Sequence, residues 1–162
     1  MKELLNIDKG FLLLIGSTYF AQGFRAYAFS DGIIWFYSHN FNLNPGPVQV
    51  YLSIISITWN IKMIYGLIFD NFPLFNLHNQ PYLLIASVSS LLGFLSLGFP
   101  ALSNTPESTI AGFWFGLMGM AMCDVIADAM VVKHARDLGE KGGADLQTFC
   151  WIMQGIGSVY II

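Results

Sequence analysis

The chain has 162 residues, of which 55% are hydrophobic and 10% charged, and its formal net charge at neutral pH is −3. A soluble domain carries roughly 25% charged residues, so this composition leaves too little charge to cover a surface in water. The seven lysine and arginine residues are also too few for the basic surface that neutralises phosphates. These values exclude nucleic-acid binding and indicate a protein whose partner is the lipid bilayer.

Apolar runs of about 20 residues, the length that crosses a bilayer as a helix, follow one another along the chain. Backbone groups in lipid must be hydrogen-bonded within their own segment, and the runs lack the alternation of a β-barrel. The predicted fold class is therefore all-α, a multi-pass transmembrane helical bundle. The predicted helices cover about residues 11–37, 48–69, 82–102, 109–132 and 146–162. We expect the last helix to be cut short, because the sequence stops inside it.

The basic residues outside these helices indicate how the chain is oriented in the membrane. They are Lys2, Lys9, Lys133, Arg136 and Lys141. All five lie before the first helix or between the fourth and fifth helices, and the loops on the opposite side contain none. The positive-inside rule then predicts that the N-terminus, the 70–81 loop and the 133–145 loop face the cytoplasm.

The fourth predicted helix carries small residues at helical spacing. Gly112 and Gly116 are four residues apart, and Gly119 follows them. Residues at this spacing share a helix face, where the lack of side chains lets a neighbouring backbone come close. We expect this face to pack against another helix.

Five charged side chains and the amide of Gln22 stand out inside the predicted helices. They are Gln22, Arg25 and Asp31 in the first helix, Lys62 in the second, and Asp124 and Asp128 in the fourth. A charge at mid-span costs at least about 2.5 to 3.5 kcal/mol on insertion scales, so such residues normally face protein or a watery cavity. They indicate either a transport path or, as the structural alternative, buried ion pairs that set the helix register.

Asp124 and Asp128 are one turn apart on one helix face, where they repel unless a cation, a proton or water intervenes. The pair suits a proton-coupled carrier and equally suits a static clamp on a lysine. Measured from the predicted helix ends, Lys62 lies about 10 Å inside, Asp128 about 7 Å and Asp124 about 13 Å. We predict that Lys62 pairs with these carboxylates, preferentially with Asp128, because a lysine stem leans its charge toward the nearer water interface.

An enzyme is the alternative from another functional class, with Asp124, Asp128 and His134 as hard metal ligands. No further carboxylates and no glycine-rich phosphate cradle accompany them, so the sequence predicts no enzyme, no cofactor and no metal centre. Trp35, Phe36 and Tyr37 at the end of the first helix are expected in an interfacial aromatic belt.

Short motifs of glycine, aromatic and charged residues occur in order along nearly the whole chain. They are Tyr19-Phe20-Ala21-Gln22-Gly23, Trp59-Asn60-Ile61-Lys62 followed by Tyr65-Gly66, the spacing of Gly66 and Asp70, Pro81-Tyr82-Leu83, the run from Asp124 to Val132 with Ala135-Arg136, and Leu146-Gln147-Thr148-Phe149-Cys150-Trp151. Together they resemble the folate-biopterin transporter family of the major facilitator superfamily.

The resemblance implies that the full protein carries folate or pteridine small molecules such as biopterin by alternating access, with proton coupling. From their charge or polarity and their place in the helices we expect Gln22, Arg25, Tyr27 and Asp31 to bind substrate, and Lys62, Asp124 and Asp128 to serve proton coupling or an ion pair. The resemblance implies a gating loop at Gly66 and Asp70. Arg25 is the expected contact for an anionic substrate, because folates are flat heteroaromatics that carry carboxylates.

The sequence departs from the family pattern at a few positions. Met63 stands where the family has proline, Phe69 stands where it has serine, and residues 77–80 lack the usual basic side chains. Family members also have two six-helix halves, so we expect this chain to be an incomplete N-terminal half whose partner is the missing C-terminal half. The alternative is a non-transporting integral membrane helical protein or fragment, whose buried charges are purely structural.

Overall fold

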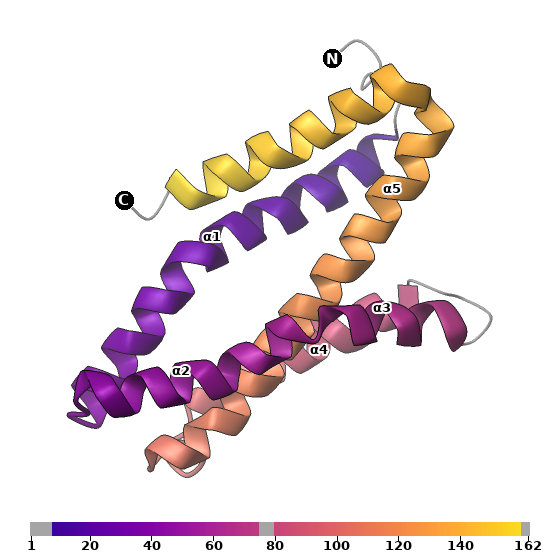
Figure 1. The fold of residues 1–162 in the computed structure, drawn as a ribbon. Coiled ribbons are helices and arrows are strands. Elements are labelled where there is room, and N and C mark those ends of the chain that lie inside the picture. The colour runs from indigo at the N-terminus through magenta and orange to yellow at the C-terminus, as the bar shows by residue number, and fades with distance from the viewer. Residues whose placement is uncertain (1–7, 75–79, 160–162) are drawn as a thin grey trace. The chain divides into compact units, whose positions relative to one another are not determined.

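A computed structural model describes residues 8–74 and 80–159 of the chain. Its elements are α1 (Lys9–Asn40), α2 (Pro45–Asn60), α3 (Lys62–Asn71), α4 (Gln80–Leu97) and α5 (Pro106–Val159) (Figure 1). All of these elements are α-helices, which confirms the predicted fold class.

Local sequence explains where α4 ends and α5 begins. Leu97 is the last residue of α4, ahead of the predicted end at 102, because Gly98 and Pro100 follow and do not continue a helix. At the start of α5 the hydroxyl of Thr105 accepts from the amide of Ser108, and the hydroxyl of Ser108 accepts from the amide of Thr105, both at 3.2 Å. This reciprocal cap satisfies two amides that the first turn leaves without a helical partner.

The predicted helix over residues 48–69 is interrupted in its middle. Ile61 separates α2 from α3 and has φ −90° and ψ 16°. Its amide donates to the carbonyl of Ile57 at 3.1 Å, while its own carbonyl accepts from the amide of Ile64 at 2.9 Å, a bond that spans three residues instead of four. The tightened turn produces a kink directly before Lys62.

Helix α5 has 54 residues, which would measure about 81 Å if it were straight, more than twice the thickness of a bilayer core. It is broken at Gly139, where φ is 72°. Glycine adopts this left-handed conformation without a Cβ clash. The prediction of a loop over residues 133–145 is therefore wrong. These residues are helical on both sides of Gly139, because most of them are good helix formers.

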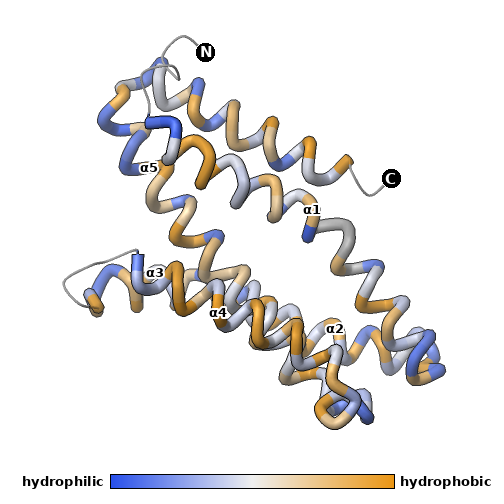
Figure 2. The backbone as a smooth tube through the Cα atoms, turned by 180° about the vertical axis from the view of Figure 1, so that it is seen from behind, coloured by the Kyte–Doolittle hydropathy of each residue, from blue (hydrophilic) through white to orange (hydrophobic). Residues whose placement is uncertain are grey.

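Three helical stretches of the described residues are long and apolar enough to cross a membrane: Pro45–Asn71, Gln80–Leu97 and Pro106–Val159. Figure 2 shows hydrophobic residues along these stretches, whereas hydrophilic residues gather around the break in α5. Many exposed side chains on α4 are large and apolar, among them Leu84, Leu91 and Leu92. This distribution suits helices that are surrounded by lipid.

The chain forms two compact units, Asp31–Ile126 and Met1–Ser30 together with Ala127–Ile162. In the first unit, α4 and α5 touch through glycines. A Cβ added to Gly93 would meet the carbonyl oxygen of Gly112 at 2.7 Å, and one added to Gly119 would meet the backbone of Ala86 and Ser90. The predicted packing face of the fourth helix is thus confirmed.

Tyr37 joins three helix ends of the same unit. It is fully buried, its hydroxyl shares a 2.8 Å hydrogen bond with that of Thr109, and its ring stacks on Tyr51 at 4.9 Å. Tyr51 in turn donates to Glu107 at 2.9 Å. The expected belt position is therefore wrong for Tyr37, whose ring packs inside the protein, while Trp35 is exposed.

In the second unit, α1 packs against α5. Its core cluster is made of Phe11, Ile15, Ala127, Val131, Leu146 and Cys150. Glycines again mark close approach: a Cβ on Gly23 would meet the backbone of Gln154, and one on Gly157 would meet the backbone of Phe20.

The glycine contacts predict a contrast between two substitutions. Gly119→Ala in the full-length protein should lower stability by on the order of 1–3 kcal/mol, because the new methyl group overlaps the backbone of α4. Gly32→Ala should be neutral or stabilising by up to about 1 kcal/mol, because nothing lies within 4 Å of its added Cβ and alanine favours the helix. Thermal unfolding of both variants in detergent measures this difference, and equal Tm values would contradict the packing.

Candidate functional site

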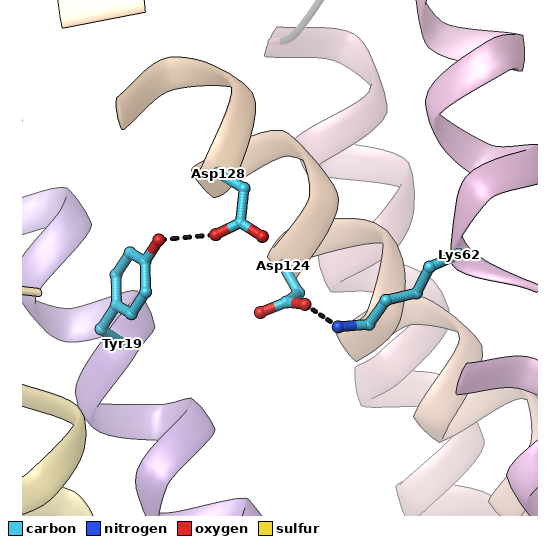
Figure 3. Close-up of polar contacts among 4 residues, drawn as sticks. All are labelled: Tyr19, Lys62, Asp124 and Asp128. Atoms are coloured by element: carbon cyan, nitrogen blue, oxygen red, sulfur yellow. Dashed lines mark hydrogen bonds and ion pairs between the residues drawn. The ribbon is translucent and has the colours of Figure 1, made fainter. Parts of the chain in front are cut away.

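An ion pair lies among the apolar helices of the unit Asp31–Ile126. Lys62, the first residue of α3, contacts the carboxylate of Asp124 on α5 (Figure 3). The side chain of Asp124 is 8% exposed and that of Lys62 is 27% exposed. Both charges are therefore largely removed from solvent and compensate each other.

The register between α3 and α5 selects Asp124 as the partner of Lys62. Gly66 faces Val125, with 3.6 Å between an added Cβ and the valine methyl group. Lys62 lies one helical turn before Gly66 along α3. It therefore lies beside the turn of α5 that directly precedes Val125. Asp124 is the carboxylate nearest that turn, whereas the sequence favoured Asp128 from depth alone.

Trp59 contacts the pair, and two further polar groups lie close to it along α3 and α5. The Lys62 ammonium lies 3.5 Å from the ring centroid of Trp59 on α2, within cation–π range. Tyr65, one turn further along α3, is buried, and its hydroxyl has no hydrogen-bond partner among the described residues. On α5, the thiol of Cys123 lies 3.8 Å from the hydroxyl of Ser87 on α4.

Asp128 has a different partner, in the other unit. Tyr19 of α1 donates a 2.5 Å hydrogen bond to its carboxylate (Figure 3). Tyr19 is half-buried and packs against the core cluster of this unit. A hydrogen bond to a carboxylate is stronger than one between neutral groups, so this contact links α1 to α5.

The other predicted residues lie on α1 and α3. Gln22 is 8% exposed, and its amide nitrogen has no hydrogen-bond partner among the described residues. Arg25 is half-buried and Asp31 is exposed, while the side chain of Tyr27 lies outside the described part of the structure. Asp70, in the last turn of α3, is also exposed.

Trp59 and Tyr19 acquire contacts that sequence reasoning did not assign to them. Trp59 precedes Lys62 by three residues, and side chains at this spacing neighbour each other on a helix. That spacing is a signal in the sequence. Nothing in the sequence signalled the contact between Tyr19 and Asp128, which are 109 positions apart.

His134 does not join the two aspartates. Its ring stacks on Phe11 with centroids 3.7 Å apart, and its Nδ1 lies 3.0 Å from the carbonyl oxygen of Met130. Within residues 8–74 and 80–159, no three histidine, cysteine, aspartate or glutamate side chains group as metal ligands.

The ion pair predicts a non-additive pattern of stability. In the full-length protein, Lys62→Met should cost about 3–5 kcal/mol, because it leaves the buried Asp124 carboxylate without its partner. Asp124→Asn should cost less, because the half-buried Lys62 ammonium keeps its contact with Trp59. The double variant should be no less stable than either single variant. Lys141→Met, at an exposed lysine, is the matched control and should change little. Thermal unfolding of the single and double variants in detergent completes a double-mutant cycle. If the stability losses of the two single variants simply add in the double variant, Lys62 and Asp124 are not coupled.

Comparison with known proteins gives the family. The BT1 family matches residues 22–161 of the chain. Probable folate-biopterin transporter 4 of Arabidopsis thaliana is 32% identical over 150 residues, which are 92% of this chain and 30% of that protein. Folate transporter 1 of Plasmodium falciparum is 31% identical over 105 residues, 65% of this chain and 21% of that protein. The folate-biopterin transporter of Synechocystis sp. is 26% identical over 148 residues, 91% of this chain and 29% of that protein.

This chain thus spans less than a third of the length of these curated relatives, which are named as transporters and not as enzymes. No solved structure matches it at comparable significance. The match over most of the chain, together with its apolar helices, shows that this is an integral membrane protein that belongs to the BT1 family.

Proposed function

We propose that the full-length protein carries folates or pteridines across a membrane by alternating access. The observation that carries this proposal is a compensated ion pair, Lys62 with Asp124, inside apolar helices of a family whose similar members are named folate and folate-biopterin transporters. Intramembrane charges that face protein commonly mark transport paths. The matched relatives are more than three times as long as this chain, so the second half against which the helices rock is a further part of the proposal.

The substrate-binding role falls on α1, at Gln22, Arg25, Tyr27 and Asp31. Gln22 supports it best, because a buried amide with an unused donor is costly unless another group completes its hydrogen bonds. A planar guanidinium such as that of Arg25 binds carboxylates through two parallel hydrogen bonds. Folates carry carboxylates and biopterin does not, so Arg25 would distinguish the two substrates.

Proton coupling falls on Lys62, Asp124 and Asp128. A proton taken up by either carboxylate cancels its charge and weakens the contact that it makes, with Lys62 in one unit and with Tyr19 in the other. Helix contacts that depend on protonation are what a proton-driven carrier requires. Gly66 and Asp70 would form the gate, because Gly66 faces Val125 of α5 and Asp70 lies at the exposed end of α3.

Uptake by cells that express the full-length protein tests the function. Labelled folic acid and labelled biopterin should accumulate above the level of control cells, and more strongly when the outside is acidic. If the protein reaches the membrane at normal levels and neither compound accumulates, the carrier proposal fails. The charges would then be structural in a non-transporting protein.

The role of Arg25 makes a sharper prediction. Arg25→Ala should reduce folate uptake about tenfold or more, the loss expected for a charge-assisted bidentate contact, and leave biopterin uptake much less affected. Arg25→Lys keeps the positive charge but not the planar guanidinium, so its folate uptake should lie between that of the unsubstituted protein and that of Arg25→Ala. An equal loss of folate and biopterin uptake at normal expression would show that Arg25 has a structural role and does not bind the folate carboxylate.

We further propose that the N-terminus and the break at Gly139 face the cytoplasm, on the basis of the one-sided basic residues. In a background with Cys123 and Cys150 replaced by alanine, a cysteine at exposed Asn44 should react with an impermeant maleimide on intact cells that carry the protein at their surface. A cysteine at exposed Lys141 should react only after permeabilisation. The reverse labelling pattern would invert the topology.

A further inference from the structure

The Lys62 ammonium has two partners of different physical kind. The carboxylate of Asp124 attracts it by charge, whereas the face of Trp59, 3.5 Å from ammonium to ring centroid, attracts it through the ring quadrupole. The second attraction does not require a negative charge. It therefore persists when Asp124 takes up a proton.

The kink at Ile61 lies between these residues along the chain. Trp59 is in the last turn of α2, and Lys62 begins α3. Trp59 is half-buried, so its ring acts on the ammonium where water screens the attraction only partly. The lysine is bound to a neighbour on its own polypeptide segment as well as to a carboxylate across the helix interface.

Three other titratable side chains lie within about one helical turn of the pair along α3 and α5. They are Tyr65 on α3, and Cys123 and Asp128 on α5. The thiol of Cys123 contacts the uncharged hydroxyl of Ser87 on α4, and the carboxylate of Asp128 accepts a hydrogen bond from Tyr19. Tyr65 and Cys123 are uncharged at neutral pH by their ordinary pKa values and add no second negative charge in this unit. When Asp124 loses its charge, the indole of Trp59 still attracts the ammonium.

We propose that Trp59 is a positioning residue for proton coupling: it holds the Lys62 ammonium whenever Asp124 is protonated, so that Asp124 can exchange a proton without an uncompensated cation inside the membrane. This role rests on the proposed carrier function. The proton comes from the water on the more acidic side, binds the carboxylate of Asp124 and leaves to the water on the other side. No bond other than that to the exchanged proton forms or breaks.

The first test measures stability and does not depend on transport. Asp124→Asn imitates the protonated carboxylate in the full-length protein. In that background Trp59→Leu should lower Tm by about twice as much as it does in the native background, because the indole is then the main partner of the ammonium. Trp59→Phe keeps a weaker ring face and should lower Tm less than Trp59→Leu.

A control separates this coupling from simple packing. In a Lys62→Met background no cation is present, and Trp59→Leu should then cost the same with either residue at position 124. Equal Tm losses for Trp59→Leu in the native and Asp124→Asn backgrounds would overturn the proposal at the level of the contact, whether or not the protein transports folates.

The second test measures the pH dependence of uptake. Trp59→Leu should reduce the ratio of folate uptake at acidic to neutral outside pH severalfold, and Trp59→Phe should restore part of it. A normal ratio, with the stability coupling intact, would overturn the role in proton exchange and leave the indole as a structural partner. An absence of uptake by the unsubstituted protein is distinguishable from both results, because it refutes the carrier function while the stability test still decides the contact.

Discussion

Lipid does not solvate a charge, and this constraint determines which contacts the ionisable side chains inside the helices make. Lys62 lies against the carboxylate of Asp124 and the ring of Trp59, and Asp128 accepts a hydrogen bond from Tyr19. Each contact compensates a charge within one compact unit. The removal of one partner is therefore expected to lower stability as well as the proposed transport, and only double variants with a readout besides uptake separate the two effects.

The remaining helix contacts depend on the absence of side chains. Lipid offers no hydrophobic driving force between helices, so close backbone packing at small residues takes its place. Helix α5 uses both kinds of contact in one stretch: Gly112 and Gly119 lie against α4, while Asp124 reaches Lys62 of α3. The glycine contacts set how closely the helices approach. At Gly66 of α3, by contrast, an added Cβ would lie 3.6 Å from the Val125 methyl group, an ordinary van der Waals contact, so the ion pair does not depend on a missing side chain there.

The departures from the family pattern have unequal structural consequences. The second helix is kinked at Ile61 even though Met63 replaces the proline that the resemblance leads one to expect. The kink is formed by a backbone hydrogen bond that spans three residues, and not by a proline ring that would prevent a helical hydrogen bond. The replacement of the basic loop residues concerns positions 77–80, of which 77–79 lie outside the described residues, so the gating role of Gly66 and Asp70 remains a proposal.

The sequence by itself determined the all-α membrane class, the glycine face of the fourth helix and the family, because hydropathy, residue spacing and short motifs are local properties. It indicated that Lys62 needs an acidic partner, since a lone ammonium in lipid is costly. Only the tertiary structure decided that this partner is Asp124, that Tyr37 is buried and that α5 is broken only at Gly139. These features depend on how helices align with one another and where a backbone reverses, and depth along an isolated helix does not specify either.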